Sequence, residues 1–98
     1  MKTLFDQHSI ATSRDVTKTY STSFYKSVSM LDDEIRDDVH AIYGMVRYAD
    51  EIVDTFHACD KAILLAEFKQ ETYQSIERKI SLNPILNAFQ ATVNQHRI

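Results

Sequence analysis

Apolar residues recur at alternating steps of four and three between residues 35 and 56, which is the strongest periodic signal in the chain. These positions, called the apolar stripe below, are Ile35, Val39, Ile42, Val46, Ala49, Val53 and Phe56. Such steps place side chains on one face of an α-helix. The spacing therefore predicts a long helix that packs through the apolar stripe. Asp32 or Asp33 is its predicted start, because acidic residues favour the positive end of the helix dipole.

A second stripe follows the same rhythm on the predicted helix, roughly a quarter-turn from the first. It contains Tyr43, Arg47, Asp50 and Asp54. Asp50 and Asp54 are four residues apart, so their carboxylates stack on one face and repel each other. A divalent cation removes this repulsion, and Mg²⁺ favours one or two carboxylates together with substrate phosphates. The pair predicts a metal–diphosphate site; the alternative is an ordinary solvated helix face.

The first part of the chain has a looser pattern. Apolar residues at helical spacing run from about residue 3 to residue 20, with Ser and Thr among them, and predict a helix. Four hydroxyl-bearing residues then stand together at positions 20–23. Hydroxyl groups compete for backbone hydrogen bonds, so the cluster disfavours a helix interior. We predict a break here and a short second helix, with Ser21 or Ser23 as its N-cap and its end near Leu31.

Two further helices are predicted in the second half. Residues Asp60 to Ile80 form an amphipathic segment, and Pro84 is well placed to open a final helix at its first turn. The side chains that we expect on the buried sides of these two helices are Ile63, Leu64, Phe68, Tyr73, Ile76, Ile80, Ile85, Leu86, Phe89, Val93 and Ile98. Five helices would thus account for most of the chain.

Composition narrows the class of protein. A chain of 98 residues is at most one small domain, and a single Gly and a single Pro disfavour a turn-rich β fold. A net charge of −3 gives no case for nucleic-acid binding. The single cysteine, Cys59, fits a reducing compartment. The longest apolar run, residues 62–66, is far short of a membrane span, and the first ten residues lack the apolar core of a signal peptide. We therefore expect a soluble, cytoplasmic, all-α protein.

Three elements together resemble the squalene/phytoene synthase family. They are Ser21-Thr22-Ser23-Phe24, then Ala41-Ile42-Tyr43 leading to Arg47, then Asp50-Glu51-Ile52-Val53-Asp54. Enzymes of this family join two prenyl diphosphates head to head through a cyclopropyl intermediate. The Asp-Glu form of the acidic motif is most similar to phytoene synthases. The resemblance implies an all-α helical bundle of the isoprenoid synthase type, built around a central cavity.

The family's second Asp-rich motif has no counterpart in this chain, and the family often has His where this chain has Tyr20. Residues 1–98 are therefore expected to be the N-terminal portion of such a domain, incomplete and inactive by itself. Such a portion would expose apolar surface, so we also expect it to self-associate.

The resemblance implies roles for individual residues. Asp50 and Asp54 would hold Mg²⁺ that bridges to the substrate diphosphate, and Arg47 would contact phosphate oxygens. The alternative for Arg47 is an intrahelical ion pair with Asp50 or Glu51. Glu51 itself is expected behind the ligands or facing solvent. The family's substrates are farnesyl or geranylgeranyl diphosphate, and NADPH is needed only if the product is squalene.

Other positions have two readings each. Ser21 and Ser23 would donate hydrogen bonds to the diphosphate, or merely cap a helix. Phe24 and Tyr43 would line the prenyl cavity, where aromatic faces stabilise allylic cations, or simply pack in the core. The four His residues show no zinc-type spacing and are expected to be surface or structural residues. Cys59 is expected to be an inert thiol.

Two other functions compete with this one. Chain-elongating prenyl synthases and terpene cyclases also use acidic motifs, but the Ser-x-Ser-Phe element argues against them. A non-catalytic helical interaction module, with an incidental acid pair, is the alternative from another class. Because the substrates are lipophilic, peripheral membrane contact by the intact enzyme is plausible. The sequence leaves open the substrate chain length and the choice among phytoene, squalene and dehydrosqualene as product.

Overall fold

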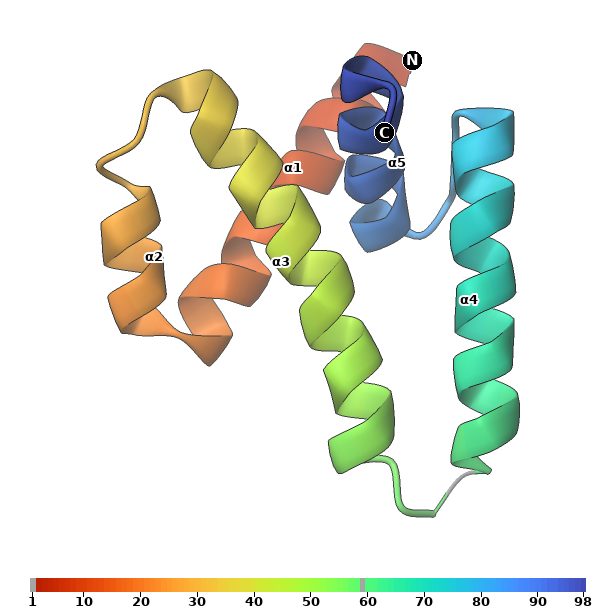
Figure 1. The fold of residues 1–98 in the computed structure, drawn as a ribbon. Helices are drawn as coiled ribbons and strands as arrows, with labels where there is room; N and C mark the ends of the chain where they lie inside the picture. Colours follow the sequence, from red (N-terminus) through yellow and green to blue (C-terminus); the bar gives the residue numbers. More distant parts are fainter. Residues whose placement is uncertain (1, 59) are drawn as a thin grey trace.

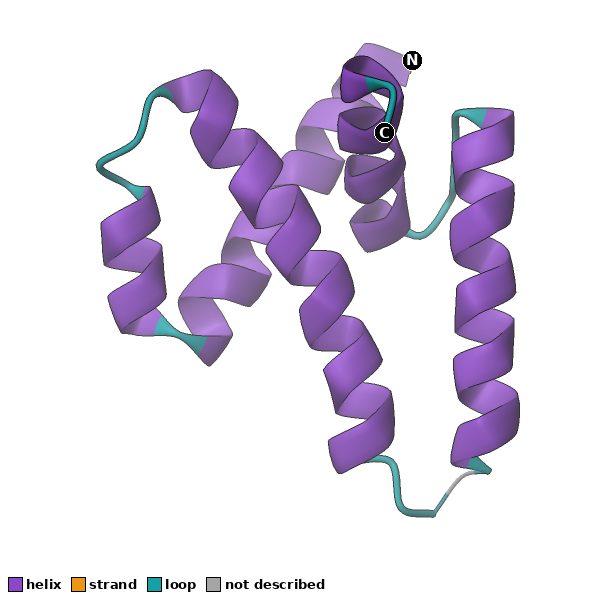
Figure 2. Cartoon of the chain, in the orientation of Figure 1, coloured by secondary structure: helices purple, strands orange, loops and turns teal. Residues whose placement is uncertain are grey.

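The described part of the chain is helical throughout. The computed structural model describes residues 2–58 and 60–98, and no strand occurs among them (Figure 1, Figure 2). The helices are α1 (Lys2–Tyr20), α2 (Thr22–Val28), α3 (Asp33–Asp54), α4 (Lys61–Arg78) and α5 (Pro84–His96). The five predicted helices and the all-α class are confirmed. None of the described helices is long and apolar enough to cross a lipid bilayer.

Local signals set the helix starts. The Ser21 hydroxyl accepts a hydrogen bond of 3.3 Å from the Phe24 backbone N–H, so Ser21 is the N-cap of α2. The Asn83 side chain accepts from the N–H of Ile85 at 3.0 Å and caps α5, with Pro84 in the first turn. Both helix starts agree with those predicted from the sequence. Predicted starts for α3 and α4 also hold, since α3 begins at residue 33 and α4 at residue 61.

The core lies where α1, α3 and α5 pack against one another (Figure 1). α4 runs beside α3 and α5, and α2 packs against α1 and α3. Gly44, the chain's one glycine, lies at the meeting point of the three core helices. A Cβ atom on Gly44 would come within 3.4 Å of Ser13 Oγ on α1 and 3.5 Å of Ile85 Cδ1 on α5. A side chain larger than a methyl group would therefore meet occupied space on both neighbouring helices.

Small polar residues form the buried face of α1. Ser9, Ser13 and Thr17 are fully buried. Each hydroxyl donates to the carbonyl four residues earlier on its own helix, at 2.9, 3.0 and 3.3 Å respectively. Asn87 of α5 donates to Ser9 Oγ at 3.0 Å and to the Asp6 carboxylate at 2.8 Å. Because buried polar groups need such partners, this network joins α1 to α5 through hydrogen bonds, in a core that also buries Val16, Ile85 and Leu86.

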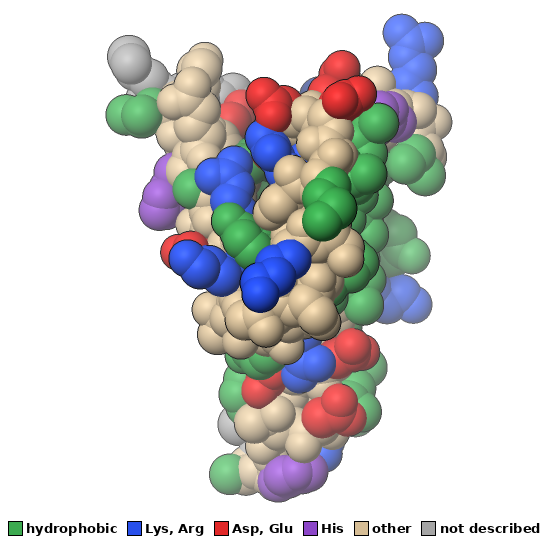
Figure 3. All heavy atoms as spheres, turned by 90° about the vertical axis from the view of Figure 1, so that its left-hand side faces the viewer, with side chains coloured by type: hydrophobic (Ala, Val, Ile, Leu, Met, Phe, Trp, Pro, Cys, Tyr) green, Lys and Arg blue, Asp and Glu red, His purple; other side chains and the backbone are tan. Residues whose placement is uncertain are grey.

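The prediction that α3 packs through the apolar stripe is wrong. Ile35, Val46 and Val53 of that stripe are 52%, 45% and 49% exposed. The buried residues of α3 are His40, Ala41, Gly44 and Ile52, on the opposite face. The reason is the packing of α1 and α5, which contact α3 along the face that carries Ala41 and Gly44, so the apolar stripe on the other face points outward. In Figure 3 hydrophobic side chains gather along the right-hand edge, which is the side of the molecule that faces the viewer in Figure 1.

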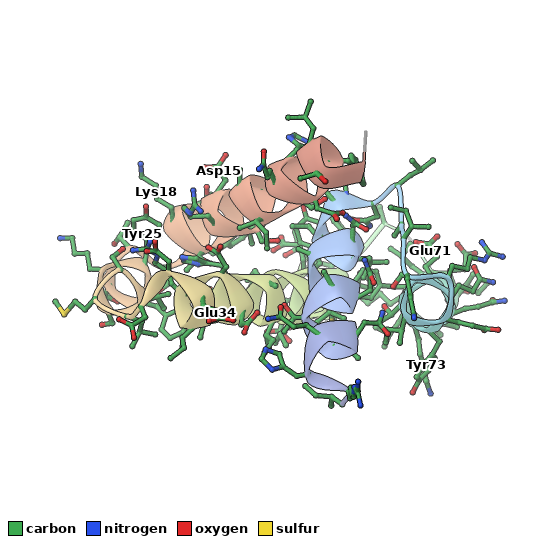
Figure 4. The ribbon with its side chains drawn as sticks, turned by 90° about the horizontal axis from the view of Figure 1, so that it is seen from above. Asp15, Lys18, Tyr25, Glu34, Glu71 and Tyr73 are labelled. Carbon is green, nitrogen blue, oxygen red and sulfur yellow. The ribbon has the colours of Figure 1, made fainter. Side chains whose placement is uncertain are left out.

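Some predicted burials on α4 and α5 are also wrong. Ile63, Tyr73, Ile80 and Ile98 are exposed. Among the described residues α4 contacts α3 and α5, which cover one side of it and leave the rest of its surface free. Figure 4 shows Tyr73 projecting from α4, away from the α1 side of the molecule.

The other predicted burials hold at least in part. Ile85, Leu86 and Val93 are buried, and Leu64, Phe68, Ile76 and Phe89 are half-buried. α5 is the better predicted of the two helices because it packs against α1, α3 and α4 together.

A groove of about 540 Å³ separates α3 from α4. Its apolar wall includes Met45 and Ala49 of α3, Phe68 and Tyr73 of α4, and Phe89 of α5. The groove opens beside the exposed apolar stripe, so apolar surface continues from α3 to α4. An exposed apolar patch of this kind marks an interaction or binding surface. The self-association that we expect from exposed apolar surface stays a prediction.

Candidate functional site

The acid pair lies on the free side of α3. Asp50 and Asp54 are both exposed, one helical turn apart, next to the apolar stripe. Within the described part of the chain, no side chain forms a hydrogen bond or ion pair with either carboxylate. Like charges at this spacing repel, and nothing nearby offsets the repulsion by direct contact. The pair is thus open to a cation from solvent.

These two carboxylates fit Mg²⁺ better than a metal enclosed by protein. Across residues 2–58 and 60–98, no group of three or more His, Cys, Asp or Glu side chains could hold an ion. Mg²⁺ binds through one or two carboxylates, keeping waters and substrate phosphates as its other ligands. Two exposed carboxylates one helical turn apart would suit such a site. The prediction that Asp50 and Asp54 bind metal is compatible with their placement and stays a prediction.

Arg47 is held from two sides. Its Nη2 donates to Glu51 Oε2 at 2.9 Å, one turn further along α3. Its guanidinium carbon lies 4.7 Å from the centre of the Tyr20 ring at the end of α1. The hydrogen bond to Glu51 raises the pKa of Arg47 above its usual range, and the same bond lowers the pKa of Glu51. The structure therefore contains the ion pair that the sequence allowed for Arg47.

Tyr20 joins this group through its ring and its hydroxyl. The hydroxyl group and the Glu51 carboxylate also interact electrostatically. Loss of hydration, followed by the negative charge of Glu51, raises the pKa of the phenol. Tyr20 and Glu51 also line a pocket of about 390 Å³ between α3 and α4, together with Phe56 and Leu64. Tyr20, Arg47 and Glu51 are called the arginine clamp below.

The Ser-x-Ser-Phe element lies against the middle of α3. The Phe24 ring is 5.3 Å from the Tyr43 ring, centre to centre, with the two planes tilted by 32°. Tyr43 is half-buried and Phe24 is partly exposed. Ser21 uses its hydroxyl as the helix cap, whereas the Ser23 side chain is exposed. The sequence elements that suggested a site are thus brought together by α2 packing on α3.

His40 occupies the core rather than the site. It is fully buried, with Nδ1 2.9 Å from Thr17 Oγ1, and its Nε2 has no partner among the described residues. Thr17 donates its own proton to the Ser13 carbonyl, so its oxygen accepts from His40 and Nδ1 carries the ring proton. Burial, helped by the charge of Arg14, lowers the His40 pKa.

The remaining predicted positions carry no site chemistry. His8, His57 and His96 are exposed, and His96 lies 2.7 Å from the Asp38 carboxylate. The expectation that the His residues are surface or structural groups is in keeping with these positions and with the burial of His40. Cys59 lies outside the described residues.

The sequence left the role of Tyr20 open and predicted that Glu51 lies behind the ligands or faces solvent. The four-residue step from Arg47 to Glu51 was a usable signal, since such pairs meet on a helix surface. Nothing local indicates Tyr20, which is 27 positions from Arg47 in the chain. Only the packing of α1 on α3 brings its ring to the guanidinium.

A protein-family model matches most of the chain. The squalene/phytoene synthase family model matches residues 17–98, which include the Ser-x-Ser-Phe element, the arginine clamp and the acid pair. No curated protein and no solved structure matches the chain. Because the family model covers most of the sequence and its motif residues converge on one side of α3, the chain belongs to the squalene/phytoene synthase family.

Proposed function

We propose that this chain is the N-terminal portion of a transferase that joins two prenyl diphosphates head to head, with Mg²⁺-assisted loss of diphosphate. Membership of the family places the chain among prenyltransferase-type enzymes. The observation that carries the finer proposal is the pair Asp50 and Asp54, exposed, unpaired within the described chain and next to an exposed apolar stripe. Charged and apolar surfaces side by side suit a substrate with a diphosphate head and a prenyl tail.

Each residue has a role in this proposal. Asp50 and Asp54 would hold Mg²⁺, which neutralises charge on the departing diphosphate. Arg47 would donate to phosphate oxygens through nitrogens other than the one bonded to Glu51. Ser23, with an exposed side chain, would add a hydroxyl donor, and Ser21 would order the turn that carries it.

The apolar surface would hold the prenyl chains. Phe24 and Tyr43 form a ring pair at the edge of the apolar stripe, and aromatic faces attract allylic cations. We propose farnesyl or geranylgeranyl diphosphate as substrate. A phytoene-type product is favoured by the Asp-Glu form of the acidic motif, and NADPH would be needed only for a squalene-type product. The family's second acidic motif is not in this sequence, so we propose that the 98-residue chain alone is inactive.

The test is binding of inorganic pyrophosphate by the 98-residue chain, measured by calorimetry with and without Mg²⁺. We expect Mg²⁺-dependent binding that is lost in Asp50→Asn with Asp54→Asn. Glu67→Gln is the matched control, because Glu67 is an exposed acid on α4. Equal binding by the double variant and the wild type would refute the metal site and favour a non-catalytic module. Product formed from geranylgeranyl diphosphate by the chain alone would refute its inactivity.

A further inference from the structure

The arginine clamp restricts one cation much more than a surface ion pair does. The side chains of Arg47 and Glu51 are only 24% and 18% exposed. Glu51 accepts a hydrogen bond from one terminal nitrogen of the guanidinium, and the guanidinium carbon lies over the Tyr20 ring, 4.7 Å from its centre. An acid and a ring on different helices therefore hold the group from two sides.

The clamp leaves part of the guanidinium without a partner. Of the Arg47 nitrogens, Nη2 alone donates to a residue of the described chain. Nε is buried and has no acceptor there. An unpaired buried donor is unfavourable, so the free chain does not satisfy Arg47. The other terminal nitrogen, Nη1, also has no partner among the described residues, and a ligand with several acceptor oxygens, such as diphosphate, would bond to it.

We propose that Tyr20 and Glu51 are positioning residues for Arg47, holding its guanidinium so that the unbonded nitrogens can meet the diphosphate held at Asp50 and Asp54. This inference rests on the proposed function for its ligand, but the clamp itself is an observation about the free chain. Asp50 also acts electrostatically on Arg47, so the acid pair and the clamp are close enough to influence one another. Tyr20 thereby gains a role that its side-chain type alone does not suggest.

Positioning and simple electrostatics predict opposite results for one variant. Glu51→Gln removes a negative charge near the diphosphate, so electrostatics alone predicts tighter binding of the anion. Positioning predicts weaker binding, because an amide holds the guanidinium less firmly than a carboxylate does. Tyr20→Leu removes the ring without changing any charge, and Tyr20→Phe keeps the ring.

The first measurement needs no ligand. Hydrogen exchange at Arg47 Nε–H, followed by nitrogen-15 NMR of the arginine side chains, reports how well the guanidinium is held. We expect slow exchange in the wild-type chain, faster exchange in Glu51→Gln and Tyr20→Leu, and recovery in Tyr20→Phe. Tyr73→Leu, which changes an exposed tyrosine on α4, should leave the Arg47 signal unchanged.

The second measurement is the dissociation constant for inorganic pyrophosphate with Mg²⁺. We expect it to rise roughly three- to fivefold in Tyr20→Leu, the range expected for losing an exposed cation–π contact, and to rise in Glu51→Gln. Wild-type exchange rates in both variants, or tighter binding by Glu51→Gln, would overturn the inference. If the wild-type chain binds no pyrophosphate, the proposed function fails; the exchange rates, measured without ligand, show separately whether the clamp exists.

Discussion

Gly44 offers the sharpest test of how α3 is placed. Helices α1, α3 and α5 meet at this residue, and a Cβ atom there would contact Ser13 and Ile85 at 3.4–3.5 Å. These are ordinary van der Waals distances, so Gly44→Ala should fit without moving a helix. Gly44→Val adds two further carbons that point into occupied space.

The expected sizes follow from these distances. Alanine is favoured over glycine inside a helix by about 1 kcal/mol, and its methyl group gains small dispersion contacts. Gly44→Ala should therefore raise the free energy of unfolding by about 1 kcal/mol, which corresponds to roughly 4–8 °C in Tm for a chain of this size. Gly44→Val should lower it by about 1–3 kcal/mol, because overpacking forces neighbours to shift.

Urea denaturation followed by circular dichroism measures both changes. Ala66→Gly on the exposed face of α4 calibrates the alanine–glycine difference, since nothing packs closely there. Two results would refute the reasoning. If Gly44→Val is as stable as Gly44→Ala, the helices do not meet at this point. If Gly44→Ala is clearly less stable than the wild type, the contact is tighter than described.

Three further predictions concern other parts of the chain. The free energy of unfolding should fall as the pH drops from 7 to 5. Burial lowers the pKa of His40 below 6.5, so the unfolded chain binds the proton more readily than the folded chain does. For one group the fall is at most about 1.4 kcal/mol per pH unit. His40→Gln should flatten this dependence in urea titrations while His57→Gln, at an exposed site, should keep it; equal slopes would contradict the assignment. Asn87→Ala should lower the free energy of unfolding by about 1–3 kcal/mol, since Asn87 is fully buried and bonded to Ser9, and a smaller loss in the same titration would show that the network matters little. Val46→Lys, at an exposed position of the apolar stripe, should reduce self-association in sedimentation while changing the free energy of unfolding by no more than about 0.5 kcal/mol; unchanged association would place the contact elsewhere.

Much of the site could be predicted because its geometry is local. A four-residue step on a helix brings two side chains together whatever the helix packs against. This rule alone predicts that Asp50 lies next to Asp54 and that Arg47 lies next to Glu51. The capping of α2 by Ser21 is equally local, because the donor is three residues away. The contact between Phe24 and Tyr43 depends on helix packing, and it was expected only through resemblance to a family.

The arginine clamp could not be predicted, since Tyr20 reaches Arg47 only where α1 crosses α3. The buried state of His40 is of the same kind, because its partner Thr17 lies on α1. Both depend on which faces of two helices meet. Side-chain periodicity on one helix carries no information about its partner.

The sequence by itself determined the five helices, their starts and the two stripes of α3, because spacing and capping act within a few residues. Only the tertiary structure decided which face of α3 is buried. A periodic apolar stripe usually packs inward, yet here α1 and α5 pack against the face of α3 that carries Gly44, and the stripe points outward. Helix contact distance is set jointly by two surfaces, so one helix read alone could not reveal it. The outward stripe lies beside Asp50 and Asp54, and our proposal of a prenyl diphosphate substrate rests on this placement.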